Sequence, residues 1–408
     1  MAIDNKDKKV LKSSIEREQN EVACSAECEK IKGSKNLNVP HLRFPEFSGE
    51  WKKCIIQDYG EVITGNTPPT NNAEYYNNGS YLWASPADLG TGKKINDTKT
   101  KLSESGFKKT RIIPKGSILV TCIGSTIGKM GMAVETMSSN QQINSIIVNE
   151  KSNNDFVYYA ISRAFPRYLS EVGVQAVPIL SKSNFEKLPN YTTSIEEQDK
   201  TGYFLNLLDE RIATQNKIID KLQSLIKGIS NKIFATIQGI EYRMGNIVTI
   251  SNGNSNVQDA VTESKDGLYP FFDRSEDIKY LPTFLFDKEA IIYPGEGAEF
   301  MPRYFRGKFA LHQRCYAIFD FKEIINAQFL YFYLKTQNSY FVRNAVGSTV
   351  PSLRLDTFQK LKVIIPPKKI QHSVSLCLSS MEQKCNVEKD ILQKLLKQKQ
   401  YLLRQMFI

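Results

Sequence analysis

The chain of 408 residues repeats part of itself at a displacement of 173 positions, and this duplication limits the folds it can adopt. Residues 177–188 recur in related form as residues 350–361, and residues 156–159 recur as residues 329–332. Further pairs at the same displacement are Lys115 with Lys288, Ile118 with Ile291, and Gln198 with Gln371. So long a period indicates a duplicated domain, not a solenoid. The segments between these landmarks differ, which predicts one shared fold carrying two different sets of loops.

Each copy ends in a stretch whose apolar residues alternate at spacings of three and four. The first seam is Leu205, Leu208, Ile212, Gln215, Ile219, Leu222, Ile226, Ile229 and Ile233. The second is Leu378, Met381, Cys385, Glu388, Leu392, Leu395, Lys399, Leu402 and Met406. This 3.5-residue period predicts two long helices in a left-handed coiled coil. Because a lone helix cannot bury such a stripe, we expect the two helices to pair. The chain passes through a whole second domain between them, so we expect the pair to be antiparallel, with a globular domain at each end.

One position of each seam is polar, Gln215 in the first and Glu388 in the second, and the two are equivalent in the repeat. A buried polar residue commonly fixes the register of a coiled coil at a cost in stability. Alternatively, both side chains lie on exposed rims of the helices. The sequence leaves both interpretations open.

The fold class that these patterns predict is α+β, with pseudo-two-fold symmetry. Residues 115–121 and 289–293 predict buried strands that follow a turn, and residues 155–163 and 327–335 favour helices. The expected segments are a charged N-terminal tail over 1–38, a first domain over 39–193, a first long helix over 194–238, a second domain over 239–366 and a second long helix over 367–408. The loops rich in Asn, Gly and Pro fall between strands.

Charge and cysteine usage narrow the class of protein. The 54 Lys and Arg residues exceed the 43 Asp and Glu residues, and the net charge of +11 attracts polyanions such as nucleic acid. Among the seven cysteines, Cys24 and Cys28 lack a second pair to complete a zinc site, so no metal is expected. No apolar run approaches the roughly 20 residues of a membrane helix, and no secretory signal begins the chain, so we expect a cytoplasmic location.

Motifs that resemble catalytic ones are incomplete. Residues 124–130 are one residue short of a phosphate-binding loop and carry Met130 where Ser or Thr would hold magnesium. Residues 50–52 contain a nuclease-like Glu-x-Lys without a preceding catalytic carboxylate, and no Asn-Pro-Pro-Tyr motif for adenine methylation is present. The three histidines are scattered, which disfavours a catalytic triad. The sequence therefore predicts a protein that is not an enzyme.

Within this duplicated frame, the chain resembles the specificity subunits of type I restriction–modification systems. The segments that carry the resemblance are residues 39–51, 65–68, 83–89, 126–129, 140–142, 293–297 and 307–313. The resemblance implies two target-recognition domains, each reading one half of an asymmetric bipartite site in double-stranded DNA. It also implies two methyltransferase subunits that bind S-adenosylmethionine, restriction subunits that cleave, and no cofactor in this chain.

Candidate DNA-binding residues follow from the polar loops. In the first domain they are Thr67, Asn71, Asn72, Ser125, Thr126, Lys129, Asn140, Gln141 and Gln142. In the second domain they are Arg274, Arg303, Arg306, Lys308, His312, Gln313 and Arg314. Arg and Lys suit guanine and phosphate, and Asn and Gln suit adenine. Ordinary turn chemistry or a solvated basic loop could also explain each residue singly, and His312 could be structural.

Two rival functions remain open from the sequence. A coiled-coil scaffold with two protein-binding domains would bind DNA weakly and without regard to sequence. A fused restriction–methylation enzyme would itself transfer methyl groups from S-adenosylmethionine. The duplicated frame with unlike loops favours the DNA reader over both.

Overall fold

A computed structural model describes residues 38–172 and 179–408 of the chain. The predicted tail lies almost wholly outside these residues, as do Cys24, Cys28, Val177 and Pro178. The described chain forms two compact units. The first unit extends to Ala213 and includes Lys394–Ile408, and the second is Thr214–Gln393.

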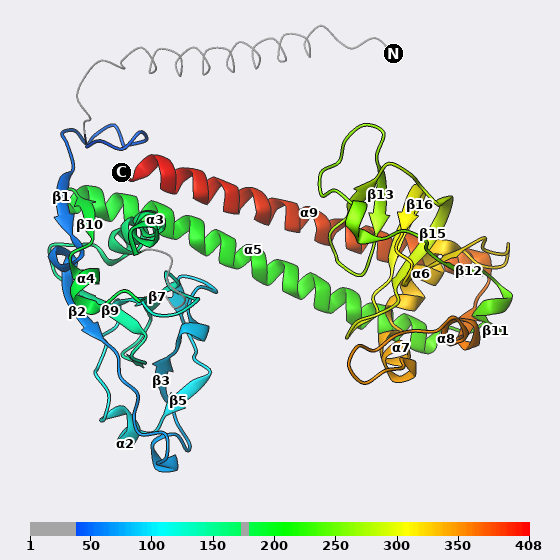
Figure 1. Ribbon diagram of the computed structural model, residues 1–408, viewed down its shortest axis with the longest axis horizontal. Helices are drawn as coiled ribbons and strands as arrows, with labels where there is room; N and C mark the ends of the chain where they lie inside the picture. Colours follow the sequence, from blue (N-terminus) through cyan, green and yellow to red (C-terminus); the bar gives the residue numbers. More distant parts are fainter. Residues whose placement is uncertain (1–37, 173–178) are drawn as a thin grey trace, which may run out of the picture. The chain divides into compact units, whose positions relative to one another are not determined.

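The first unit contains a five-stranded sheet between two layers (Figure 1). Its strands, in spatial order, are β2 (Gly60–Thr64), β9 (Ile143–Val148), β6 (Ile118–Thr121), β7 (Met130–Ala133) and β4 (Lys94–Ile95). Ile118 and Val120 of β6 pack against the helix α3 (Asn154–Val172), whereas Leu119 faces a three-stranded sheet. That sheet orders β5 (Thr100–Leu102), β3 (Tyr81–Ala84) and β8 (Ser138–Ser139). Burial on both faces explains why β6 is continuously apolar.

The second unit repeats the same central strand order in a six-stranded sheet. Its strands, in spatial order, are β12 (Thr249–Asn252), β17 (Cys315–Phe319), β15 (Phe286–Pro294), β16 (Arg303–Leu311), β13 (Tyr269–Phe272) and β14 (Lys279–Leu281). The helices α6 (Ala327–Lys335), α7 (Asn338–Asn344) and α8 (Leu355–Lys360) follow. The order β12-β17-β15-β16 matches β2-β9-β6-β7, which confirms the duplication.

Smaller elements complete each unit. The strand β1 (Lys52–Ile55) pairs antiparallel with β10 (Pro189–Thr192), and β11 (Ile240–Arg243) pairs in the same way with β18 (Lys362–Ile365). The short helices α2 (Glu104–Phe107) and α4 (Lys182–Glu186) lie in the first unit. Each two-stranded sheet joins the start of a domain to the strand that precedes its long helix.

The long helices are α5 (Ile195–Thr236) and α9 (Lys368–Met406), and they lie side by side within each unit (Figure 1). In the first unit Leu205 packs in one core with Leu402 and Met406. In the second unit Phe234 packs in one core with Leu378. All predicted seam residues are buried or half-buried, whereas Leu207 and Leu396 beside the seams are exposed. Early residues of α5 pack with late residues of α9, and late residues of α5 pack with early residues of α9. The helices are therefore antiparallel, as expected.

The polar seam residues contact each other in the second unit. The Nε2 atom of Gln215 donates to a carboxylate oxygen of Glu388 at 2.6 Å and to its backbone oxygen at 3.0 Å. Both residues are buried, so they do not lie on exposed rims. Hydrogen bonds from Lys384 and Gln215 lower the pKa of the Glu388 carboxyl. In an antiparallel pair of equivalent helices, equivalent positions face each other only at the midpoint of the overlap, so the contact between Gln215 and Glu388 marks the register of the pair.

The same joint fastens a long helix to the start of a shorter helix in each unit. In the first unit Gln198 of α5 accepts from the backbone N–H of Asn153, whose side chain caps α3. In the second unit Gln371 of α9 accepts from the N–H of Asn326, whose side chain caps α6. The repeated glutamines are therefore explained by structure. None of the helices in the described residues is long and apolar enough to cross a membrane.

Candidate nucleic-acid interface

Three loops of the first unit meet at one end of its sheet. Gly65, directly after β2, donates its N–H to Ile143, and the next residue, Asn66, donates to Ser139. The turn before β9 reaches the β6–β7 loop, because Cys122 donates its N–H to the carbonyl of Gln142. A Cβ atom on Gly65 would lie 2.3 Å from the backbone oxygens of residues 139 and 140, so this approach requires glycine. The loops that carry the predicted first-domain residues therefore adjoin one another.

The second unit builds the same convergence from different residues. Gly253, directly after β12, donates its N–H to Cys315, and a Cβ atom there would lie 2.0 Å from the Leu311 oxygen. Ser255 in turn accepts from the N–H of Gln313, in the turn before β17. The loop after the first strand thus lies over the turn before the equivalent central strand in both units. The backbone contacts agree between the two units, whereas the turn before the central strand carries Asn140 and Gln142 in the first unit and His312 and Arg314 in the second.

The repeated sequence motif braces the β6–β7 loop and its counterpart. Leu180 donates its N–H to Cys122, and the equivalent Leu353 donates to Gly295. One residue earlier, Ile179 forms a bridge with Ile123, and Ser352 forms the equivalent bridge with Glu296. The motif is therefore a fixed support beneath variable loops.

The predicted residues of the first unit fall into two groups. Thr67 donates its hydroxyl to the Gln141 side chain, and these two residues lie at the convergence. Asn140 is buried and hydrogen-bonds Gln142, so it holds the turn in place. Exposed or half-buried residues of the adjoining β6–β7 loop are Ser125, Thr126 and Lys129.

Two further predicted residues lie on the turn that follows Thr67. Asn72 accepts from the N–H of Glu74 and so caps a short 3-10 helix, Ala73–Tyr75. Its neighbour Asn71 is exposed. Ordinary turn chemistry accounts for Asn72 in this structure.

Four predicted residues of the second unit line one cavity of about 330 Å³. They are Arg274, His312, Gln313 and Arg314, and the acidic residues Asp273 and Glu296 lie among them. Arg314 pairs with Glu296, with both N···O distances at 2.9 Å, and this arginine remains largely exposed. The cavity therefore presents donors from Arg and Gln over an acidic floor.

The remaining basic residues of the second unit, on β16, do not act as one cluster. The guanidinium of Arg303 donates to the backbone carbonyls of Asp273 and Ser275 and stacks on Phe272. Arg306 and Lys308 follow it along the strand and are exposed. Arg303 thus holds the 273–276 loop, whereas Arg306 and Lys308 present their charge on the other face of the strand.

Comparison with known families identifies the class of protein to which this duplicated fold belongs. Residues 48–224 and 240–397 each match the type I restriction modification DNA specificity domain. The chain belongs to the type I restriction–modification specificity subunits. Such a subunit recognises DNA and is not an enzyme, in agreement with the incomplete catalytic motifs.

Individual relatives agree with this assignment. The chain is 25% identical to the MjaIX specificity subunit of Methanocaldococcus jannaschii over 84% of this chain and 89% of that protein. It is 29% identical to the HindI specificity subunit of Haemophilus influenzae over 43% of this chain and 40% of that one. An S subunit structure from M. genitalium superposes with a TM-score of 0.63 at 18% identity, covering 91% and 99% of the two chains. This last likeness shows a shared fold.

In this specificity subunit, the sequence patterns missed two basic residues beside the first convergence. Asn66 accepts from the N–H of Arg111 and donates to the carbonyl of Lys109. Arg111 also donates to the carbonyl of Thr64, and both basic residues are exposed. The run of basic residues over 108–111 was the available signal, but 43 residues separate Lys109 from Asn66 along the chain.

Asp273 in the second-unit cavity is held in its ionised form by its hydrogen bonds. Burial alone would raise the pKa of Asp273, yet hydrogen bonds from Lys279 and Ser275 hold this pKa below its usual value. Burial lowers the pKa of His312, although Asp273 opposes that shift, so the ring is neutral near pH 7. Its Nδ1 accepts from the N–H of Arg314 at 3.3 Å, which places the ring proton on Nε2. His312 therefore both supports the turn and offers one donor to the cavity.

Proposed function

We propose that this specificity subunit reads an asymmetric two-part site in double-stranded DNA, one part with the loop convergence of each unit. The observation that carries the proposal is the repeated frame with unlike side chains at the turn before the central strand: Asn140 and Gln142 of the first unit occupy the positions that His312 and Arg314 occupy in the second. Because the two backbones are equivalent, each unit would present the side chains of its converging loops to DNA in the same way. Unlike side chains then select different bases.

The chemistry of the two convergences supports different base preferences. The amides of Gln141 and Gln142 suit the N6 and N7 edge of adenine. Arg274 and Arg314 offer the forked donors that suit guanine O6 and N7. Lys109, Arg111 and Lys129 are exposed or half-buried beside the first convergence and suit phosphate.

The partners follow from the family. Two methyltransferase subunits would bind S-adenosylmethionine and methylate adenine N6, and restriction subunits would cleave unmodified DNA. The chain itself would hold no cofactor and would act in the cytoplasm. The support for this assembly is that the relatives are named as subunits of type I restriction enzymes.

Mapping of methylated adenines tests the proposal. The chain would be produced with the methyltransferase of its own system in a host that lacks adenine methylation, and N6-methyladenine would be located by single-molecule sequencing. The expected result is one motif made of two unlike halves around a spacer of fixed length. Methylation without a sequence motif would support the scaffold alternative, and methylation by the chain alone would support the fused-enzyme alternative.

A further inference from the structure

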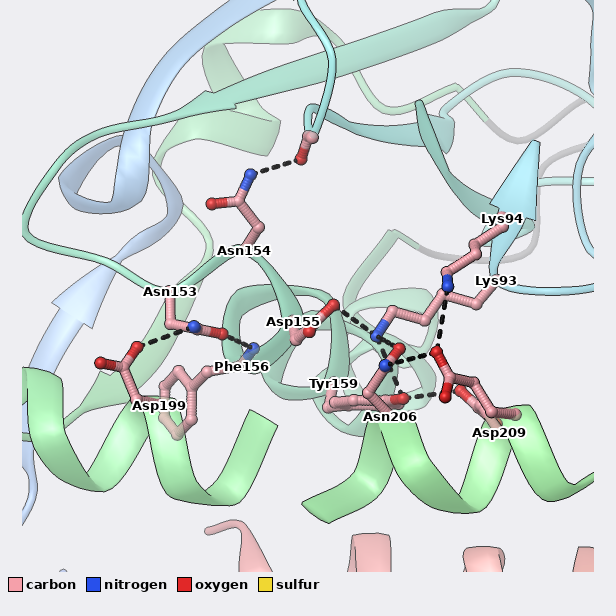
Figure 2. A network of polar contacts seen from close by, with 12 residues as sticks. Lys93, Lys94, Asn153, Asn154, Asp155, Phe156, Tyr159, Asp199, Asn206 and Asp209 are labelled. Carbon is pink, nitrogen blue, oxygen red and sulfur yellow. Dashed lines mark hydrogen bonds and ion pairs between the residues drawn. The ribbon is translucent and has the colours of Figure 1, made fainter. Parts of the chain in front are cut away.

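A buried lysine joins four elements of the first unit (Figure 2). The ammonium of Lys93, just before β4, lies 2.6 Å from the carboxylate of Asp155 and donates to Asn206 at 3.0 Å. It also lies 3.2 Å from the hydroxyl of Tyr159. Tyr159 donates to Asp209 at 2.6 Å, and Lys399 pairs with that same carboxylate at 2.5 Å. The contacts link the β4 loop, α3, α5 and α9.

The burial of this lysine is unusual enough to need a role. Only 3% of the Lys93 side chain is exposed. Desolvation lowers the pKa of Lys93, and the contact with Asp155 opposes that shift. A buried ion pair seldom adds net stability over an apolar pair of the same volume. What directional polar contacts add is a single preferred geometry, because each donor and acceptor must point at its partner.

The adjacent residue provides a natural contrast. Lys94 pairs with a carboxylate of α5, that of Glu210, and about half of each of these two side chains is exposed. An exposed pair of this kind contributes little and restricts geometry weakly. The two neighbouring lysines therefore differ in burial, while they share charge and sequence context and both contact α5.

The second copy holds the same helix position differently. Glu382 of α9 is the equivalent of Asp209, and it pairs with Lys335 of α6, while the Tyr331 hydroxyl lies 3.5 Å away. The pair is partly exposed, and a cavity of about 720 Å³ lies beside it. Only the first unit inserts a lysine from its sheet layer into this joint among the described residues.

We propose that Lys93 is a positioning residue that fixes the orientation of the first unit's sheet on its helices, and that it thereby sets how strictly the spacer of the DNA site is measured. This inference rests on the proposed function. Each half-site is read where the loops of one unit converge, so the distance between half-sites depends on how rigidly each sheet is held on the helices. A looser joint would leave base reading intact and would tolerate spacers of neighbouring length.

The test uses the full chain in complex with its methyltransferase and maps N6-methyladenine, which reports half-site sequence and spacer length separately. The variants are Lys93→Met and the double variant Lys93→Met with Asp155→Leu, in which the half-buried carboxylate is removed together with its partner lysine. Lys94→Met is the matched control. We expect unchanged half-site sequences and an increase of about tenfold in methylated sites whose spacer differs by one base pair, equal to ~1.4 kcal/mol less discrimination.

The alternative outcomes are distinct. If both variants lower total methylation but keep the wild-type spacer distribution, Lys93 is merely structural and the inference fails while the proposed function stands. An equal broadening in Lys94→Met would also overturn it. If neither variant folds, the network is needed for the fold itself, which again contradicts a positioning role. If the wild-type subunit gives no two-part motif, the proposed function itself fails.

Discussion

The glycines that follow β2 and β12, Gly65 and Gly253, have no space for a Cβ atom. Gly65→Ala would place a methyl group 2.3 Å from two backbone oxygens of the opposing turn. We expect the turn to shift at a cost of ~1–3 kcal/mol, and binding to a DNA duplex that carries the intact site to weaken by about tenfold or more. Fluorescence anisotropy with the methyltransferase complex measures this effect. Gly92→Ala is the control, since a Cβ atom there would meet nothing within 4 Å, and equal losses in both variants would contradict the account.

Arg306 and Lys308 are expected to contact phosphate, and salt dependence distinguishes this from base reading. Replacing both with Gln should lower the slope of log K against log salt by about 2, since each phosphate contact contributes roughly 0.9. Arg303→Gln should leave the slope unchanged. It should instead lower thermal stability, because the carbonyls of Asp273 and Ser275 lose their donor. A reduced slope in Arg303→Gln would show that this side chain faces DNA.

At the scale of helices, two neighbouring leucines of α9 test the effect of burial, because the residue type is the same and only the exposed fraction differs. Leu395 belongs to the seam and is 6% exposed, whereas Leu396 is 47% exposed. Leu395→Ala should lower the free energy of unfolding by ~2–4 kcal/mol through lost burial and a residual cavity, and Leu396→Ala by about 0.5 kcal/mol or less. Urea denaturation of the two variants measures both changes. Similar losses would show that α9 does not bury the predicted stripe.

Glu388, which pairs with Lys384 and accepts from Gln215, gives the helix pair a dependence on pH. The pKa of Glu388 is lowered in the folded chain, so its contribution is present above the unfolded pKa of about 4.3 and is lost as pH falls through the folded value. Glu388→Gln should therefore lose less thermal stability than the wild type between pH 5 and pH 3, as followed by circular dichroism. Glu323→Gln, at an exposed position, is the control. Parallel curves for all three proteins would contradict the role of this contact.

Elements with a local signal were predictable from sequence, and contacts between distant loops were not. The seam spacing predicts both long helices because each turn of a helix repeats within the sequence itself. The contact of Thr67 with Gln141 joins residues 74 positions apart, so sequence patterns predict two polar loops without predicting that they meet. The basic residues of β16 show the same limit. Their charge is visible in the sequence, but the bonds of Arg303 to carbonyls depend on where the 273–276 loop folds back.

At the scale of the whole molecule, each unit has a core and a loop support of its own. The first unit has its own core beneath α3, and the second has its own beneath α6. Each convergence is braced by its own copy of the repeated motif, through Leu180 or Leu353. A change of side chain at one convergence should therefore leave the geometry of the other unchanged, as substitutions without shared partners generally do.

This independence predicts that the two halves of the DNA motif can be altered separately. Thr67→Ala with Gln141→Ala should relax base choice in one half, and Gln313→Ala with Arg314→Ala in the other, because each removes donors from only one convergence. Loss of a bidentate contact costs ~1–3 kcal/mol of discrimination, so about 5- to 150-fold at the affected base. Methylation mapping of both variants assigns each half to its unit. If either variant changed both halves or only the spacer, the loops would not be separate readers, and the duplicated frame would need another explanation.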